Sequence, residues 1–193
     1  MLNNLKKYHV ILASNSPRRK ELLSGLGVSY EVRTLSDIDE SYPETLKGAD
    51  IPLFISMQKA NAYKKMLQPN ELMITADTIV WLEDRVLGKP QDREEAIQML
   101  HALSGQIHQV FTGVCLTTTT FQKNFAAATE VRFANLTDEE IVYYVDTYLP
   151  MDKAGAYGVQ EWIGFVGVEN ISGSYFNVMG LPVQRLYNEL KKL

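Results

Sequence analysis

The stretch that decides the fold is ILASNSPRRKELL, residues 11–23. Its first residues continue a short apolar run that begins at Val10, and such a run is typical of a buried strand. Ser16 followed by Pro17 is the pattern of a helix N-cap with proline in the first helical position. The stretch therefore predicts a strand, a tight loop and a helix in succession.

Positive charge gathers at the start of this helix. Arg18, Arg19 and Lys20 fall in the first turn, where the helix dipole disfavours each cation by about 0.3–1 kcal/mol. Backbone N–H groups, the hydroxyls of Ser14 and Ser16 and the arginine side chains would together bind a phosphate group. The alternative is a solvated helix start whose arginines point into water.

Length and composition limit the class of protein. The chain has 193 residues, of which 46% are hydrophobic and 22% charged, as in an ordinary globular protein with one well-buried core. We expect a single domain over residues 1–193, built of two merged lobes, because no repeat or Gly/Ser/Pro-rich linker divides the chain. The net charge of −4 argues against a partner that is a nucleic acid polymer.

Several other residues give little information about function: the cysteine, the histidines and the N-terminal residues. A single cysteine, Cys115, is expected to be a small buried residue of a strand, with no disulfide and no zinc cluster. His101 and His108 have no metal-ligand spacing and are expected to be exposed or hydrogen-bonded. The polar N-terminus and the lack of a run of 18 apolar residues predict a cytoplasmic protein that does not bind a membrane.

Helices and strands alternate along the chain, which predicts an α/β fold with a strongly twisted, mixed sheet and flanking helices. Two hairpin-like pairs argue against a purely parallel sheet. Helices are expected over 51–66, after the N-caps Asp92 and Thr137, and over 181–193. Strands are expected over 28–34, 72–76, 79–82, 110–120, 125–133, 162–168 and 174–178, with a hairpin connection at 122–124 between the fourth and the fifth.

Two acidic positions are candidates for chemistry. Asp37, Asp39 and Glu40 lie in one loop, which is either a solvated turn or a set of oxygen ligands for a divalent cation. Asp77 follows the apolar run 72–76, at what we expect to be the carboxyl end of a core strand. A buried carboxylate there needs a metal ion or a cationic side chain, unless Asp77 merely caps a turn.

Two lysines and a glycine-rich loop complete the candidates. Lys59 lies one position off the apolar stripe of its helix, where a lysine usually extends into water. Lys89 lies between Gly88 and Pro90, which we expect to form a stiff loop. The loop 152–160 is small and glycine-rich, so its backbone can approach a ligand closely.

Seven short motifs follow in order along nearly the whole chain: SNSPRR (14–19), QKA (58–60), ADT (76–78), GKP (88–90), LSG (103–105), DKAGAYGVQ (152–160) and MGLP (179–182). Each is weak alone, but seven in order are specific. Together they resemble the Maf family of nucleoside triphosphate pyrophosphatases. The resemblance implies a fold similar to the inosine triphosphatases, with two lobes, a central cleft and often a homodimer.

The resemblance also implies an activity: hydrolysis of a nucleoside triphosphate to the monophosphate and pyrophosphate with a divalent cation, Mg²⁺ or Mn²⁺. Asp77 would accept the proton, and Glu40 with Asp77 would hold the cation. Lys59 and Lys89 would act at the reacting phosphates. The residues expected to bind the substrate are Ser14, Ser16, Arg18, Arg19, Thr78 and Gln160.

Three of these positions bear on the base. Arg18, Thr78 and Gln160 resemble the branch of the family that acts on dTTP and UTP, whereas the branch acting on 7-methyl-GTP has tryptophan, glutamine and glutamate there. Tryptophan can stack on a methylated, positively charged guanine, while a glutamine amide suits the O4 and N3–H edge of uracil and thymine. The chain departs from many relatives at Glu161-Trp162, where they have glycine, and the segment up to Gly173 is about one residue longer.

Two other functions compete with this interpretation. The same pocket could sense a nucleotide and regulate cell division through a partner, without catalysis. A phosphatase acting on sugar phosphates would instead release orthophosphate. A P-loop and a complete dinucleotide-binding fingerprint are both missing from the sequence.

Overall fold

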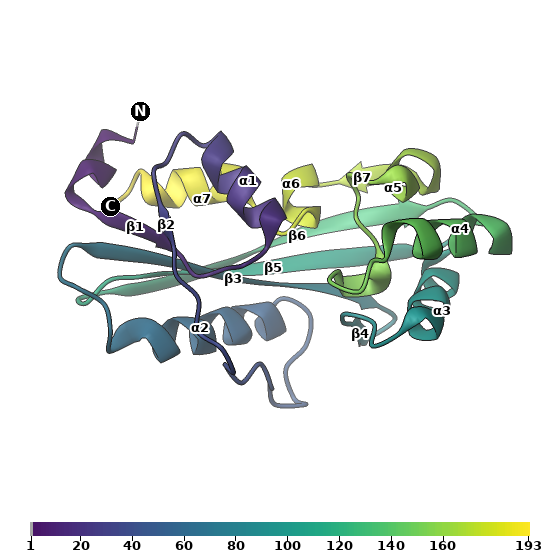
Figure 1. Cartoon of the computed structure of the whole chain (residues 1–193), viewed down its shortest axis with the longest axis horizontal. Coiled ribbons are helices and arrows are strands. Elements are labelled where there is room, and N and C mark those ends of the chain that lie inside the picture. The colour runs from purple at the N-terminus through teal and green to yellow at the C-terminus, as the bar shows by residue number, and fades with distance from the viewer. Residues whose placement is uncertain (1) are drawn as a thin grey trace. The chain divides into compact units, whose positions relative to one another are not determined.

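The computed structural model describes residues 2–193 (Figure 1). Its elements are η1 (Asn3–Lys7), β1 (His9–Leu12), α1 (Pro17–Gly25), β2 (Glu31–Val32), α2 (Asp50–Lys64), β3 (Glu71–Leu82), β4 (Arg85–Leu87), α3 (Arg93–Leu103), β5 (Ile107–Thr117), β6 (Gln122–Phe133), α4 (Asp138–Tyr148), η2 (Ala154–Ala156), α5 (Trp162–Gly167), β7 (Val168–Ser172), α6 (Tyr175–Val178) and α7 (Val183–Leu190). Within residues 2–193, no helix is long and apolar enough to cross a membrane.

The strands form one mixed sheet in the order β2-β1-β3-β5-β6-β7, with β4 also paired to β3. β1 runs parallel to both β2 and β3, whereas β4 is antiparallel to β3 and β7 is antiparallel to β6. The predicted α/β fold with a mixed sheet and flanking helices is therefore confirmed.

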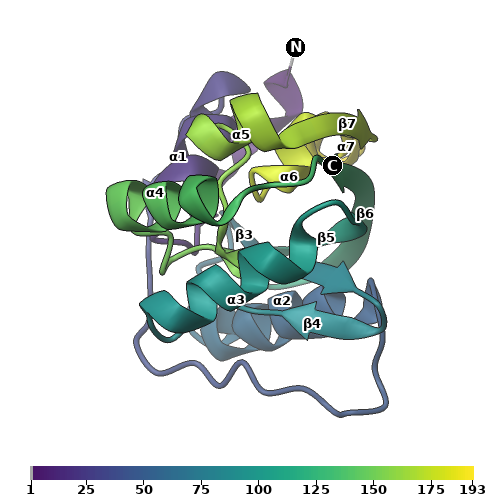
Figure 2. The same cartoon turned by 90° about the vertical axis from the view of Figure 1, so that its right-hand side faces the viewer.

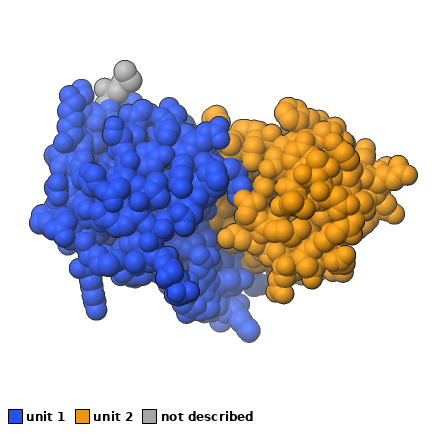
Figure 3. Space-filling view, in the orientation of Figure 1, with its two compact units in different colours: residues 1–77, 112–127, 180–193 blue, residues 78–111, 128–179 orange. Residues whose placement is uncertain are grey.

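The chain divides into two compact units (Figure 3). The first comprises residues 1–77, 112–127 and 180–193, and the second comprises residues 78–111 and 128–179.

In the first unit, helices lie on both sides of the strands: α2 on one side, and α1 with α7 on the other (Figure 1). The side chains of Ile11, Tyr63, Leu67 and Met73 pack together as a buried cluster. Gly113 of β5 allows α2 to come close, because a Cβ on this residue would lie 2.3 Å from the Pro52 carbonyl. A backbone contact of this kind leaves room for glycine alone.

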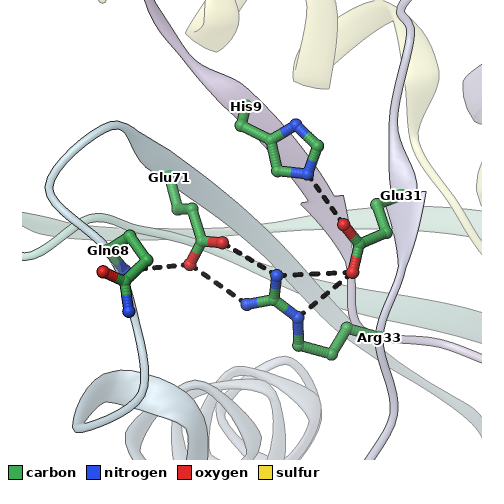
Figure 4. Close-up of polar contacts among 5 residues, drawn as sticks. All are labelled: His9, Glu31, Arg33, Gln68 and Glu71. Atoms are coloured by element: carbon green, nitrogen blue, oxygen red, sulfur yellow. Dashed lines mark hydrogen bonds and ion pairs between the residues drawn. The ribbon is translucent and has the colours of Figure 1, made fainter.

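A polar network joins β1, β2 and β3 at one end of the first unit (Figure 4). Arg33 holds the buried carboxylate of Glu71 through two parallel hydrogen bonds of 2.8 and 3.0 Å, and these bonds lower the pKa of Glu71. Glu31 receives a hydrogen bond from Arg33 and pairs with His9. The network fixes the short strand β2 beside β1.

In the second unit, α3 and α4 pack against each other (Figure 2). Both begin at caps that the sequence predicts. Asp92 accepts a hydrogen bond from the backbone of Glu95, and Thr137 forms a reciprocal capping box with Glu140. These caps supply partners for the backbone N–H groups that a helix start leaves unsatisfied.

Some predicted elements are wrong. The expected strand at 162–168 is mainly the helix α5, and the expected strand at 174–178 is the helix α6, with β7 between them. Short apolar runs do not distinguish a strand from a buried helix. The strand expected over 28–34 is only two residues long, and the β5–β6 connection lies at 118–121 instead of 122–124.

Candidate functional site

The loop between β1 and α1 is organised by its two serines. Ser16 caps the helix, since its hydroxyl oxygen accepts a hydrogen bond from the backbone N–H of Arg19 at 3.4 Å. The Ser14 hydroxyl is buried and accepts from the backbone N–H of Ser16 at 3.2 Å. The predicted N-cap and the proline at the helix start are confirmed, and both hydroxyl groups still have a proton to donate to a ligand.

Arg19 fixes this helix start to β3 and to the segment that precedes α7. Its Nη1 donates to the carbonyl of Ala76 at 2.8 Å, and its Nε donates to the carbonyl of Gly180 at 2.9 Å. Burial lowers the pKa of Arg19, while the nearby carboxylates of Asp77 and Glu40 raise it. Arg19 therefore brings permanent positive charge close to both carboxylates, in addition to its structural role.

Lys59 lies between those two carboxylates. Its ammonium is 2.8 Å from Asp77 Oδ1 and 3.0 Å from Glu40 Oε1. The side chains of Lys59 and Asp77 are 13% and 12% exposed, so this ion pair is well shielded, whereas Glu40 is half exposed. Lys59 is thus the cationic partner that a buried Asp77 requires.

The acidic loop is held in place by its apolar neighbours. Ile38 packs against the buried cluster of the first unit, and the backbone N–H of Leu35 donates to the Tyr63 hydroxyl at 2.6 Å. These contacts attach the loop to α2, the helix that carries Lys59. Glu40 therefore reaches the ammonium from a fixed segment instead of lying in a purely solvated turn.

The position of Asp77 differs from the expected one. The strand does not end at this residue, because β3 continues from Glu71 to Leu82. The neighbouring strand β1 ends instead, with Leu12 opposite Ile74. Asp77 therefore lies just beyond the carboxyl end of β1, at a point where β3 is no longer paired with β1.

Glu40 and Asp77 offer the type of ligand atom that a divalent cation binds. Mg²⁺ binds carboxylate oxygens and is usually held by one or two carboxylates together with substrate phosphates. The two side chains contact the same positive group, the Lys59 ammonium, at 3.0 and 2.8 Å. The donor set is suitable for Mg²⁺ or Mn²⁺.

The remaining candidates belong to the second unit. Thr78 follows Asp77 directly on β3. Lys89 is exposed, and its loop is tied to the glycine-rich loop by a hydrogen bond from Gly155 N–H to the Gly88 carbonyl at 2.9 Å. The loop does not need a glycine at 88, because a Cβ there would meet no atom within 4 Å in the described structure. The tie to Gly155 is what restrains Lys89.

Gln160 ends the glycine-rich loop. Its side-chain oxygen Oε1 is buried and has no hydrogen-bond partner among residues 2–193. The next residue, Glu161, pairs with Lys153 at 3.1 Å and accepts a hydrogen bond from Tyr144. The sequence does not single out Tyr144 or Lys153 for a polar role, because Tyr144 reads as an apolar position of α4 and the pairing depends on the fold.

The solved structures that match this chain have low sequence identity to it. A HAM1 protein from Coxiella burnetii is 14% identical over 96% of this chain and 100% of its own, with a TM-score of 0.49. A nucleoside-triphosphatase, or dITP/XTP pyrophosphatase, from Mycobacterium abscessus is 16% identical over 66% of this chain and 75% of its own, with a TM-score of 0.41.

Sequence relatives are much closer. A dTTP/UTP pyrophosphatase from Bacteroides thetaiotaomicron is 69% identical over the whole of both chains. Proteins with the same name from Parabacteroides distasonis and Porphyromonas gingivalis are 61% and 54% identical, over 99% of this chain and 99% and 97% of their own. The model of the family described as Maf-like protein matches residues 9–193. The chain belongs to the Maf family.

Proposed function

We propose that this protein hydrolyses dTTP and UTP to the nucleoside monophosphate and pyrophosphate. The observation that carries the proposal is the contact of Lys59 with both Asp77 and Glu40, beside Arg19, in a chain that is 69% identical to a dTTP/UTP pyrophosphatase. A site that only sensed nucleotides would need the cations but would have no use for a shielded carboxylate that can take a proton.

The reaction follows from the residues of the first unit. A water oxygen forms a bond to the α-phosphorus while the bond from that phosphorus to the bridging oxygen of the pyrophosphate breaks. Asp77 takes the proton of the water, and Lys59 orients the Asp77 carboxylate through its 2.8 Å contact. Pyrophosphate leaves with the electron pair of the broken bond.

Basic side chains compensate the charge of the triphosphate. Arg18 lies in the first turn of α1, where the helix dipole and a guanidinium together attract phosphate oxygens. We assign Lys89 to the pyrophosphate leaving group, whose negative charge grows as the bond breaks. Ser14 and Ser16 donate hydroxyl hydrogen bonds to the phosphates in this scheme.

A divalent cation, Mg²⁺ or Mn²⁺, belongs to the proposal as the cofactor held by Glu40 and Asp77. When bound it neutralises charge on the phosphate oxygens. The shared contact of both carboxylates with one ammonium supports this assignment. Activity should disappear when EDTA is added and return with excess Mg²⁺ or Mn²⁺.

The deciding experiment is a panel of nucleoside triphosphates, with pyrophosphate and orthophosphate measured separately. We expect pyrophosphate from dTTP and UTP and much slower turnover of CTP and the purine triphosphates. Orthophosphate as the first product would indicate a phosphatase instead. Nucleotide binding without turnover would favour the regulator of cell division.

The family resemblance supports two further proposals, a homodimer and a cytoplasmic location. Apolar side chains are exposed on the second unit, with Phe165 at 83% and Phe176 at 45%, and such residues are common where subunits meet. Sedimentation equilibrium would give the mass of the particle. A mass of one chain at micromolar concentration would refute the dimer.

A further inference from the structure

Glu161 folds back over the glycine-rich loop of the second unit. Its Oε1 pairs with the buried ammonium of Lys153 at 3.1 Å, and its Oε2 accepts the hydroxyl proton of Tyr144. The Tyr144 oxygen in turn accepts a hydrogen bond from the backbone N–H of Gly158 at 2.9 Å. Helix α4, Glu161 and the loop are therefore joined in one polar network.

The direction of these hydrogen bonds is fixed. Burial of the hydroxyl, together with the Glu161 carboxylate, raises the pKa of Tyr144 above its ordinary value. Tyr144 therefore keeps its proton and donates it to Glu161, which leaves the hydroxyl oxygen to accept from Gly158. A group that both donates and accepts cannot rotate without losing one of the two bonds.

The network encloses a tight turn that carries Gln160. The backbone N–H of Glu161 donates to the carbonyl of Gly158 at 2.9 Å, which makes Gln160 the third residue of a β-turn. A Cβ on Gly158 would lie 2.8 Å from the Glu161 carboxyl carbon and 3.1 Å from Gln160 Nε2. Glycine at 158 thus lets both side chains pack over the turn.

Gln160 is held by this turn with an unused acceptor. Its Oε1 is buried and lacks a hydrogen-bond partner in the described chain, which costs roughly 1–3 kcal/mol for a polar group. The amide nitrogen lies against Gly158, since a Cβ there would be 3.1 Å from Nε2, so the oxygen is the group left for a ligand. A donor on a bound base would remove the cost.

We infer that Glu161, through Tyr144 and Lys153, is a positioning residue that sets the orientation of Gln160 toward the base of the nucleotide. The inference rests on the proposed function and deepens it. Uracil and thymine carry an N3–H donor beside O4, which matches one amide with an oxygen and an NH₂ group. Cytosine has a bare N3 and an exocyclic amine, so a correctly held Gln160 discriminates against CTP.

The test compares the ratio of kcat/KM for UTP to that for CTP in four variants. Glu161→Ala removes the acceptor of Tyr144 and one of the two carboxylates that pair with Lys153, the other being Asp152 at 2.8 Å. Tyr144→Phe removes the bridging hydroxyl. Glu161→Gln keeps an acceptor for Tyr144 but loses the charge opposite Lys153. Tyr143→Phe is the matched control, because it removes the same atom from the neighbouring residue of α4, which is half exposed.

We expect Glu161→Ala and Tyr144→Phe to lower the UTP-to-CTP ratio by roughly tenfold, the equivalent of about one hydrogen bond to the base. The change should come mainly from a higher KM for UTP, with kcat less affected, because the reacting phosphates are bound elsewhere. Glu161→Gln should retain part of the preference. Tyr143→Phe should match the wild type.

The affinity for the non-hydrolysable analogue α,β-imido-UTP, measured by calorimetry, should fall in the variants in which KM for UTP rises. An unchanged ratio in Tyr144→Phe and Glu161→Gln, even with a lower Tm, would show that the network only stabilises the loop and would overturn the inference. If Glu161→Ala does not fold, these two variants decide. A wild-type protein without activity on UTP and dTTP would instead refute the proposed function, which keeps the two failures distinct.

Discussion

Asp77 is the residue on which the proposed chemistry depends most. We expect Asp77→Asn to lower kcat by on the order of 10²-fold or more, because the amide cannot take a proton from water. The substitution keeps the shape of the side chain, and an amide oxygen can still accept from Lys59, so the Tm should change little. Steady-state release of pyrophosphate from UTP measures the effect.

The exposed carboxylate Glu94 provides the control for this substitution, since its side chain is 70% exposed on α3. Glu94→Gln removes one negative charge and should leave kcat unchanged. Near-normal turnover of Asp77→Asn would mean that Asp77 serves the ion pair with Lys59 and not the reaction.

His108 makes stability depend on pH. It is buried, bonded to the Tyr157 hydroxyl at 2.7 Å and packed edge-on against Phe133, and burial lowers its pKa from 6.5 to about 4. The unfolded chain therefore binds a proton below about pH 6.5, whereas the folded chain does so only near pH 4. The contribution to stability is present above pH 6.5 and is lost as the pH falls toward 4.

Replacement of this group should flatten the pH dependence. The free energy of unfolding, measured in urea at pH 7.5 and at pH 5.0, should fall between these pH values by about 2 kcal/mol more in the wild type than in His108→Gln. Glutamine cannot titrate but can still bond the Tyr157 hydroxyl, so the variant isolates the proton. Equal losses in both proteins would show that His108 is protonated in the folded state as readily as in the unfolded chain.

The types of residue in the site could be predicted from the sequence, but their partners could not. Asp77 after an apolar run signals a carboxylate that needs a cation, and the structure identifies that cation as Lys59, which lies 18 residues earlier on α2. Lys59 itself looks like an ordinary lysine beside an apolar stripe. Only the packing of α2 against the strands makes it a buried partner of Asp77.

Local signals predicted helix starts better than strand limits. Ser16, Asp92 and Thr137 were all identified as caps because a cap bonds to a backbone N–H three residues away. The length of β3 depends on neighbours far along the chain: β1 supports it as far as Ile74, and β4 pairs with Val80 to Leu82. No pattern within residues 71–82 contains that information.

The close contact between β5 and α2 predicts that a side chain at Gly113 would lower the stability of the protein. Gly113→Ala should destabilise the protein by about 1–3 kcal/mol, because the new Cβ would lie 2.3 Å from the carbonyl of Pro52 and 2.5 Å from the N–H of Leu53. Neither backbone can move without shifting a whole helix or strand. The loss should lower the Tm by about 2–4 °C per kcal/mol in a chain of this length.

Gly25→Ala in α1 is the matched control, since a Cβ there meets no atom within 4 Å in the described part of the chain. Alanine favours a helix over glycine by roughly 0.5–1 kcal/mol, so the Tm should stay the same or rise. A Gly113→Ala variant as stable as Gly25→Ala would show that α2 does not approach β5 so closely.

For the molecule as a whole, the order of the strands and the division into units lie beyond sequence patterns. Three of the unit boundaries fall inside strands, at 77/78 in β3, 111/112 in β5 and 127/128 in β6. A boundary within a strand needs the same apolar residues as the rest of the strand. It therefore leaves no glycine-rich or polar linker for composition to reveal.

The choice of base is expected to depend on Arg18, Thr78 and Gln160, which are far apart in the sequence. We expect the combined variant Arg18→Trp, Thr78→Gln, Gln160→Glu to shift preference from dTTP and UTP toward 7-methyl-GTP. The tryptophan can stack on the cationic base, and the glutamate can accept hydrogen bonds from its N–H edge, whereas a glutamate opposite uracil O4 would bring two acceptors together. The kcat/KM values for UTP and 7-methyl-GTP measure the shift.

Arg18→Trp alone should weaken UTP turnover without creating the new preference, because Gln160 would still present its amide. A wild-type protein that prefers 7-methyl-GTP over both pyrimidine nucleotides would show that these three positions do not select the base.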